Sequence, residues 1–164
     1  MKIANDTMLK IQAQDGEIEV SQKLMNKSIL VKSIIDDSSP DDEIPLPEVT
    51  IATILKCLEL SEILTKQEWV EIETPIITNQ LKGIIPSVFV NYIDLDNDIL
   101  FDLILAANYL DFKELMLLSS AKIASLMKNK DINEIRNMFG IENDFTPEEE
   151  AKMDKENKWI EDAY

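Results

Sequence analysis

The sequence contains no histidine, the side chain that most often moves protons in enzymes. Its absence excludes Ser-His and Cys-His nucleophilic pairs and imidazole ligands for a metal ion. The single cysteine, Cys57, excludes an intrachain disulfide. The nearby residues Ile54, Leu55 and Leu58 are apolar, so we interpret it as a buried structural thiol. We therefore expect no catalytic residue, no cofactor and no metal site.

Glycine and basic residues are also scarce. The three glycines, at positions 16, 83 and 140, are too far apart to form a phosphate-binding loop. There are 16 basic and 32 acidic residues, which makes the net charge −16. Nucleic acids and anionic membranes both favour lysine and arginine, so we expect neither as a partner. A basic partner protein would fit this charge, and simple solubility is the alternative explanation.

The N-terminal stretch 1–12 lacks the continuous apolar core of a signal peptide. With a single cysteine, nothing indicates an oxidising compartment. We therefore expect the protein in the cytoplasm and the nucleus.

What is present is the composition of a folded domain, with 45% apolar residues in 164. The densest apolar segment, LFDLILAANYLDFKEL at 100–115, predicts a buried helix that is too short and too charged to span a bilayer. Asn108 and Tyr109 are polar members of this segment that need partners or access to solvent. Asp111 and Glu114 have the spacing of a capping box, so we predict two helices that break near Asp111.

Three short strands are predicted before this segment. Residues 8–13 alternate between apolar and polar, which is typical of a half-buried strand. Asp15-Gly16 predicts a hairpin turn, with a returning strand at 18–20. The prolines within 44–49 predict an edge strand.

Helix-capping residues predict the helices of this first part. Ser21 and Ser28 are expected to cap short helices that end near residues 26 and 35, before an acidic loop at 36–43. Thr50 is expected to cap a helix with its apolar face at positions 51, 54, 55 and 58. Pro86 is expected at the first position of a helix that ends near residue 93. We interpret residues 66–83 as a surface loop, with a further short strand as the alternative.

The C-terminal part is predicted to be helical. Asp131 and Glu134 form a capping-box pattern, and Gly140 is a helix stop. Thr146, followed by Pro147 and Glu149, predicts a helix from 147 to about 158. This helix is so polar that it either extends into solvent or binds a partner. Trp159 near its end either folds back onto the chain or anchors a partner, and the pattern leaves both readings open.

Five motifs stand in an order that resembles the Skp adaptor family: 14–18 (QDGEI), 45–47 (PLP), 104–111 (ILAANYLD), 143–150 (NDFTPEEE) and 155–159 (KENKW). Skp proteins, the S-phase kinase-associated proteins, bridge a cullin scaffold and an F-box protein in SCF ubiquitin ligases. The resemblance implies an α+β fold in which a BTB/POZ-like α/β domain with a small mixed sheet (1–111) precedes a helical F-box-binding extension (112–164). The helix at 100–110 would be shared by both parts.

The resemblance also implies binding residues. Asn108 and Tyr109 match cullin contacts of the family. A larger group matches the F-box surface: Met116, Ser120, Ile123, Met127, Phe139, Ile141, Asn143, Phe145, Asn157 and Trp159. Pro147 matches a proline that is hydroxylated and glycosylated in some protist members.

Some residues depart from the family pattern. Pro86-Ser-Val-Phe89 replaces the usual Pro-Val-Trp-Asp, the hairpin is one residue shorter, and the 66–83 loop is more apolar. The leading hypothesis is a non-enzymatic SCF adaptor that binds F-box proteins and a cullin, and that forms a weak homodimer when free. The alternatives are an F-box-binding subunit outside a cullin ligase, such as a kinetochore-type complex, and an enzyme with Cys57 as a ubiquitin-carrying thiol.

Overall fold

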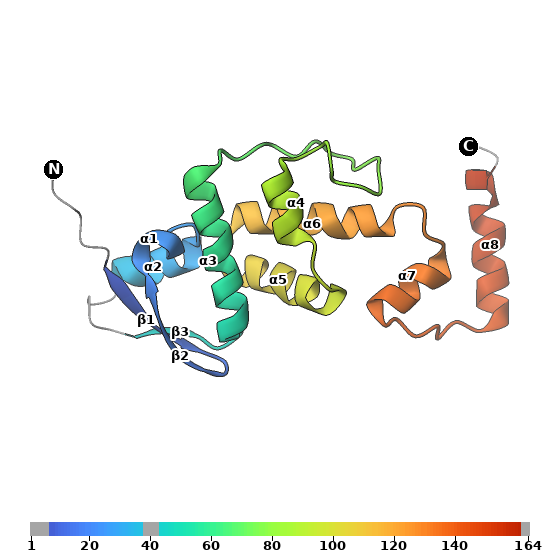
Figure 1. Cartoon of the computed structure of the whole chain (residues 1–164). Helices are drawn as coiled ribbons and strands as arrows, with labels where there is room; N and C mark the ends of the chain where they lie inside the picture. Colours follow the sequence, from blue (N-terminus) through green and yellow to red (C-terminus); the bar gives the residue numbers. More distant parts are fainter. Residues whose placement is uncertain (1–6, 38–42, 162–164) are drawn as a thin grey trace. The chain divides into compact units, whose positions relative to one another are not determined.

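The computed structural model describes residues 7–37 and 43–161, and side chains as far as residue 158. The chain divides into two compact units, Met1–Asn129 and Lys130–Tyr164. The elements of the first unit are β1 (Met8–Ala13), β2 (Gly16–Ser21), α1 (Gln22–Met25), α2 (Ile29–Asp37), β3 (Ile44–Leu46), α3 (Ile51–Lys66), α4 (Ser87–Ile93), α5 (Asn97–Tyr109) and α6 (Lys113–Met127) (Figure 1). Those of the second unit are α7 (Ile132–Phe139) and α8 (Pro147–Glu161). The expected α+β architecture with a small mixed sheet is confirmed.

The sheet has the strand order β2-β1-β3, with β2 antiparallel and β3 parallel to β1. All three predicted strands are present, although β2 begins at Gly16, inside the predicted turn, and β3 ends at Leu46. Pro45 lies in an edge strand, where its missing N–H is tolerated. The two-residue turn is Gln14-Asp15, and Gly16 begins β2 with φ +151°. A side chain at position 16 would be strained at this φ, and its Cβ would lie 3.3 Å from Cδ1 of Ile51.

The hairpin tip contacts the beginning of α3. The Gln14 N–H donates to the Val49 carbonyl at 2.9 Å, and Asp15 Oδ1 accepts from the Ile51 N–H at 2.8 Å. Thr50 caps the same helix, since its hydroxyl accepts from the Thr53 N–H at 3.3 Å. The cap at Thr50 is as predicted, whereas Asp15 adds a second acceptor from a distant part of the chain.

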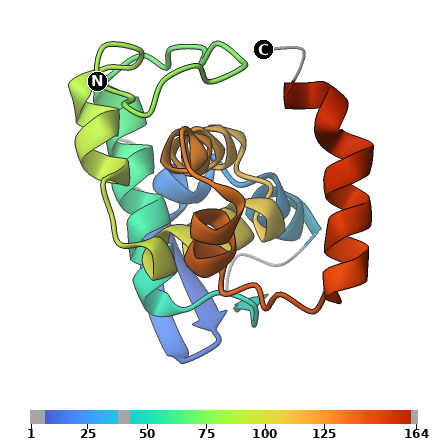
Figure 2. The ribbon, with the colours of Figure 1, turned by 90° about the vertical axis from the view of Figure 1, so that its right-hand side faces the viewer.

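The core centres on α5, which lies beside α6 (Figures 1 and 2). Leu100, Leu103 and Ala107 are fully buried, as expected. The prediction that this helix is buried all round is wrong, however, because Leu105 is 67% exposed. The elements packed against α5 cover one side of it and leave the side with Leu105 in solvent.

The end of α5 differs from the prediction. Asp111 has φ +48°, and the N–H groups of Asp111 and Phe112 donate back to the carbonyls of Asn108 (3.3 Å) and Ala107 (2.9 Å). This is a Schellman-type helix end with Asp111 in the left-handed position. The predicted capping box at Asp111 is therefore wrong. Its Glu114 instead forms an ion pair with Lys27 at 2.8 Å.

The end of α5 also supports the beginning of α2. The carbonyls of Leu110 and Asp111 accept from the N–H groups of Leu30 and Ile29, each at 3.3 Å. Ser28 links the two helices further, because its buried hydroxyl donates to the Leu110 carbonyl at 2.6 Å and accepts from the Val31 N–H at 3.1 Å. The predicted cap at Ser28 is confirmed. Ser21 takes the N-cap position of α1 without a side-chain cap hydrogen bond.

Other predictions in the first unit need smaller corrections. The buried face of α3 includes Ile54, Cys57 and Leu60, whereas Leu55, expected inside, is 51% exposed. Pro86 is the N-cap of α4 instead of its first residue. Most of the predicted acidic loop at 36–43 lies outside the described residues, although α2 extends to residue 37.

The segment 66–83 has the predicted loop character. In the described chain it contains no strand beyond an isolated bridge between Lys82 and Ile85. It is nonetheless well packed, with Ile72 and Leu81 buried. The Trp69 ring meets the buried Phe89 ring of α4 edge to face, with centroids 5.4 Å apart.

In the second unit the predicted helix ends are confirmed. Asp131 and Glu134 form a reciprocal capping box, and Gly140 ends α7 at φ +63°. Pro147 begins α8. Glu149 Oε2 accepts from the Thr146 N–H and hydroxyl, each at 2.9 Å, and the Thr146 hydroxyl lies 3.4 Å from the Glu149 N–H.

The boundary between the units follows the packing of α6. Because α6 packs on α5, the compact unit continues to Asn129. The expected division after residue 111 concerned partner-binding regions and stays a prediction. None of the helices described is long and apolar enough to cross a membrane. The described acidic and cysteine side chains form no cluster suited to hold a metal ion.

The Ser28 linkage predicts a loss of stability in Ser28→Ala. This change removes a helix cap and leaves the buried Leu110 carbonyl without the hydroxyl, so the free energy of unfolding should fall by about 1–3 kcal/mol. Urea denaturation measures the change. Ser33→Ala, at an exposed position of the same helix, is the control and should stay within about 0.5 kcal/mol of the parent. Equal stabilities of the two variants would contradict the linkage.

The cap of α8 predicts a pH-dependent change. The hydrogen bonds from the Thr146 N–H and then its hydroxyl lower the pKa of Glu149 below its ordinary value. A depressed pKa means that the cap is fully formed above the ordinary glutamate pKa and is lost as the pH falls through the lowered pKa. The Thr146 amide proton shift, followed by NMR, should therefore titrate with a midpoint below that of an unstructured glutamate.

The matched variant for this titration is Glu149→Gln, which retains a hydrogen-bond acceptor and cannot titrate. In this variant the acid transition of the Thr146 amide should disappear. A midpoint at or above the ordinary glutamate value in the parent protein would refute the cap.

Candidate partner-binding surfaces

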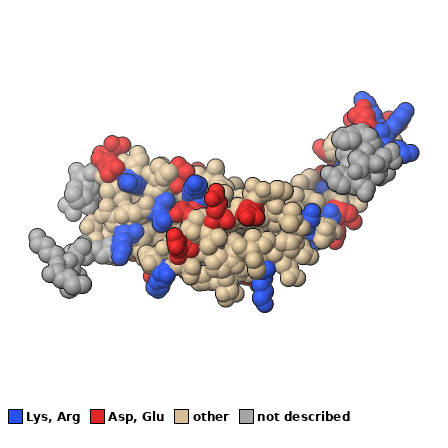
Figure 3. Space-filling view, turned by 90° about the horizontal axis from the view of Figure 1, so that it is seen from above, with Lys and Arg blue, Asp and Glu red and all other residues tan. Residues whose placement is uncertain are grey.

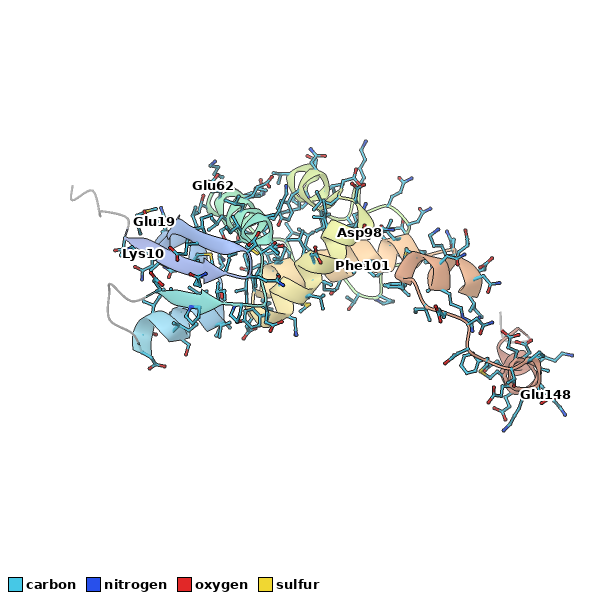
Figure 4. All side chains as sticks on the ribbon, turned by 90° about the horizontal axis from the view of Figure 1, so that it is seen from below. Lys10, Glu19, Glu62, Asp98, Phe101 and Glu148 are labelled. Atoms are coloured by element: carbon cyan, nitrogen blue, oxygen red, sulfur yellow. The ribbon has the colours of Figure 1, made fainter. Side chains whose placement is uncertain are left out.

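The first candidate surface is the exposed side of α5. Asn108 is exposed and Tyr109 half-buried, as their polar character required. Leu105 lies three and four residues before them, on the same helix face, and is 67% exposed. Phe101, one further turn back and labelled in Figure 4, is half-buried. We call Phe101, Leu105, Asn108 and Tyr109 the α5 surface.

The α5 surface includes a residue that the sequence reasoning missed. A large, exposed apolar side chain such as Leu105 marks a contact site more clearly than a scattered surface leucine when it adjoins polar residues that need partners. The signal was present in the spacing of Leu105 from Asn108 and Tyr109. It was overlooked because the whole segment was interpreted as buried.

A shallow, mostly apolar hollow adjoins the end of this surface. Its volume is about 360 Å³, and it lies between the ends of α2, α5 and α6. Its lining includes Asn108 and Met116 together with the exposed side chains of Ile29 and Leu117. The structure thus brings an expected cullin contact and an expected F-box contact to the same hollow.

Four of the expected F-box residues lie on α6, in the first unit. Met116, Ser120, Ile123 and Met127 recur every three or four residues and so share one helix face. Ser120 is exposed and the other three are half-buried. The buried positions of α6 are Leu115, Leu118, Ser119, Ala121 and Ser125. The four expected residues therefore form an accessible stripe beside the core-facing side.

The remaining expected F-box residues lie in the second unit. Helix α7 has no buried residue, and its end and the following loop present apolar side chains: Phe139 is half-buried, Ile141 is 56% exposed and Phe145 is 45% exposed. Asn157 is exposed on α8. Trp159 lies within α8, but its side chain is outside the described part of the structure.

Two charged residues that the sequence reasoning missed hold this region together. The Arg136 guanidinium lies 5.8 Å from the centre of the Phe145 ring and 3.9 Å from Glu150 Oε1. The same Glu150 oxygen accepts from Asn143 Nδ2 at 2.6 Å. Asn143 and Phe145 are therefore positioned by contacts from α7 and α8. The signal in the sequence was only a charged residue on each helix, which does not identify a partner.

Pro147 is exposed at the first position of α8. Its side chain is accessible, and its missing N–H removes no helix hydrogen bond at this position. The expected hydroxylation and glycosylation stay a prediction.

The electrostatics of Cys57 oppose a chemical role. Burial raises the pKa of the Cys57 thiol to about 12, so the thiolate is scarce at neutral pH. The nearby Tyr92 also has a raised pKa, mainly because of burial, and its hydroxyl donates to the Lys56 carbonyl at 2.9 Å. Tyr92 therefore does not provide a base that would activate the Cys57 thiol.

Charges elsewhere are interspersed. Seen from above, acidic and basic side chains alternate over the first unit and form no basic patch on this face (Figure 3). Elsewhere in the first unit, the amine of Lys122 lies 2.9 Å from Asp94 Oδ1 and lowers the pKa of this carboxyl.

The sequence is similar to those of known proteins over nearly the whole chain. The model of the Skp1 family tetramerisation domain, its POZ part, matches residues 7–65, and that of the Skp1 family dimerisation domain matches 113–160. An S-phase kinase-associated protein 1 homolog of Tetrahymena thermophila is 45% identical over 159 residues, 96% of each chain.

Shorter matches agree. A Skp1-related protein of Caenorhabditis elegans is 51% identical over 73 residues, 44% of this chain and 42% of that protein. The E3 ubiquitin ligase complex SCF subunit sconC of Emericella nidulans is 48% identical over 71 residues, 43% of this chain and 44% of that protein. Because both family domains match and one relative is 45% identical over 96% of the chain, this chain belongs to the Skp1 family.

Proposed function

We propose that this protein is a non-catalytic adaptor of an SCF-type E3 ubiquitin ligase, which bridges a cullin scaffold and F-box substrate receptors. The observation that supports it most is the presence of two exposed groups of residues in a Skp1-family chain: the α5 surface, and the stripe on α6 with the apolar residues around α7. An adaptor needs two such surfaces and no reaction chemistry. Relatives named as SCF subunits support the same role.

In this proposal the cullin binds the α5 surface. Leu105 supplies a large apolar area, while Asn108 and Tyr109 supply polar groups at its margin. Such an arrangement of an apolar centre and a polar rim is typical of protein interfaces. The altered 86–89 segment does not remove this surface, since Phe89 is 1% exposed and packs against Trp69. The alternative role outside a cullin ligase has no observation in its favour.

F-box proteins bind the second surface in this proposal. Met116, Ile123 and Met127 provide adaptable apolar side chains on α6. Ile141 and Phe145 add exposed apolar area in the second unit, where no described residue of α7 is buried. Because α7 buries little apolar surface within its own unit, a partner that covers this surface would stabilise the region.

Residue chemistry supports the non-catalytic part of this proposal. The sequence has no histidine, and the one thiol is buried with a raised pKa. A ubiquitin-carrying cysteine needs an accessible thiolate, which Cys57 does not provide.

The cullin surface is tested by Leu105→Glu. A charge in the centre of an apolar contact should weaken binding of the cullin N-terminal region by about a hundredfold, because burial of an unpaired carboxylate costs several kcal/mol. F-box binding should be unchanged. Isothermal titration calorimetry with each partner in turn measures both affinities.

The control is Ile77→Glu, which introduces the same charge at a site that is 77% exposed and remote in sequence from both surfaces. It should leave both affinities unchanged. Cullin binding by Leu105→Glu at the parental affinity would contradict the assignment of this surface.

The F-box surface is tested by Ile141→Glu, at a side chain that is 56% exposed. Recruitment of F-box proteins should fall by at least about tenfold, whereas cullin binding should remain, because the two surfaces share no residue. Pull-down of each partner, with Ile77→Glu as the control, measures the outcome. Loss of the cullin together with the F-box protein would contradict separate surfaces.

We also infer that the free protein forms a weak homodimer through the F-box surface, since exposed apolar residues gather there. The Ile141→Glu variant should then sediment as a monomer at concentrations where the parent protein self-associates. A dimer that is unaffected by this change would place self-association elsewhere.

A further inference from the structure

Among the described residues, the outer edge of β2 carries unpaired backbone hydrogen-bonding groups at Glu17 and Glu19. Ala13 pairs with Gly16 across a two-residue turn, and such a pair exchanges both of its backbone hydrogen bonds. By alternation Ile18 and Val20 also bond to β1, so the N–H and C=O groups of Glu17 and Glu19 point away from β1. β2 has only this one neighbour in the sheet, and no hydrogen bond within the described chain engages the backbone of either glutamate.

The side chains on the outer face of the sheet make this edge acidic. Glu17 and Glu19 are exposed there, and Lys10 on β1 stands opposite Glu19 (Figure 4). A hollow of about 310 Å³ beside these residues is lined by Lys10, by the three glutamates Glu17, Glu19 and Glu43, and by Ile11 and Ile18. The hollow is lined by three acidic residues and one basic residue. This excess of negative charge would attract a further cation.

The inner face of the same edge is apolar and incompletely covered. Ile18 faces the core side of the sheet but is only half-buried, whereas its neighbours Ile11 and Val20 are buried. A strand added beside β2 would place alternate residues next to the glutamates on the outer face and next to Ile18 on the inner face. The edge therefore matches a segment in which basic and apolar residues alternate.

We propose that the edge of β2 binds an extended segment of a partner protein, with alternating Lys or Arg and apolar residues, by adding it as a strand to the sheet. In this binding mode the backbone hydrogen bonds provide affinity and the alternate side chains provide specificity. The partner's cations lie beside Glu17 and Glu19, and its apolar residue covers Ile18. This surface shares no residue with the α5 or F-box surfaces and goes beyond the adaptor function.

The same charges select this partner over a second copy of the chain. Exposed edges of a sheet tend to pair with one another, and charged residues are a common protection against this. Two β2 edges side by side would bring the glutamates of both copies close together, which is unfavourable. Pairing of two β2 edges is therefore disfavoured, whereas binding of a basic strand is not.

The test uses the full chain and a short fluorescent peptide in which lysine and valine alternate. Fluorescence anisotropy should show saturable binding that weakens with added salt. Glu19→Pro removes the outward N–H without removing a hydrogen bond to β1, and it should lower the affinity by about tenfold or more. Glu19→Gln, which keeps the N–H, should lose only a few-fold, as expected for one exposed charge.

Two further measurements separate strand addition from simple charge attraction. Hydrogen exchange at the Glu17 and Glu19 amides should slow when the peptide binds. A peptide of the same sequence with alternate backbone nitrogens methylated should not bind, and this control leaves the protein unchanged if Glu19→Pro fails to fold. Glu62→Gln, at an exposed position in the C-terminal part of α3, controls for total charge and should leave the affinity unchanged.

The proposal is overturned if the peptide shows no saturable binding, if the methylated peptide binds as well as the unmodified one, or if the two amides exchange at the same rate with and without peptide. Binding of the cullin and of F-box proteins should be normal in Glu19→Gln. Failure of the adaptor function would therefore show in the Leu105 and Ile141 variants and failure of strand addition in the peptide measurements.

Discussion

The end of α5 is held by the beginning of α2, and much of the first unit depends on this junction. The carbonyls of Leu110 and Asp111 accept the first N–H groups of α2, and the Ser28 hydroxyl adds a buried hydrogen bond to Leu110. Both helix ends thereby satisfy backbone groups that would otherwise be unpaired. The junction fixes the point at which the chain turns into α6. It thus positions Asn108 and Tyr109 at the end of α5 relative to the beginning of the α6 stripe, and Asn108 and Met116 line the same hollow.

An adaptor has to present two surfaces without chemistry of its own, and the chain meets this need with two kinds of structure. The α5 surface lies on a helix whose opposite side is in the core, so its residues are rigidly placed. The second unit buries little, and its loop is held by a few polar contacts around Arg136 and Glu150. The exposed apolar residues of the second unit favour binding of a partner that buries them. The departures from the family pattern lie outside these two surfaces. Two of them, the apolar 66–83 loop and Phe89, contact each other through the rings of Trp69 and Phe89.

The predictions that failed share a physical cause. The Asp111 and Glu114 spacing satisfies the rule for a capping box, but the same residues also suit a left-handed helix end and an ion pair with Lys27. Which arrangement forms depends on α2, which is far away in the sequence. Leu55 and Leu105 were expected inside because apolar periodicity shows that a helix has a buried face but not how much of its circumference the neighbouring elements cover. The expected binding residues come from the family resemblance and stay predictions, whereas the fold was needed to find Leu105, Arg136 and Glu150 beside them.

The sequence by itself determined the features whose two partners lie within a few residues of each other. The caps at Thr50, Asp131 and Thr146, the helix start at Pro147, the helix end at Gly140 and the strand at 8–13 are of this kind, because local hydrogen bonds and alternation need no distant contact. Only the tertiary structure decided the Ser28 bond to Leu110, 82 residues away, and the Asp15 bond to Ile51, 36 residues away. It likewise decided which side of α5 and which edge of the sheet stay open. These depend on where the chain's other elements pack, which no local pattern records.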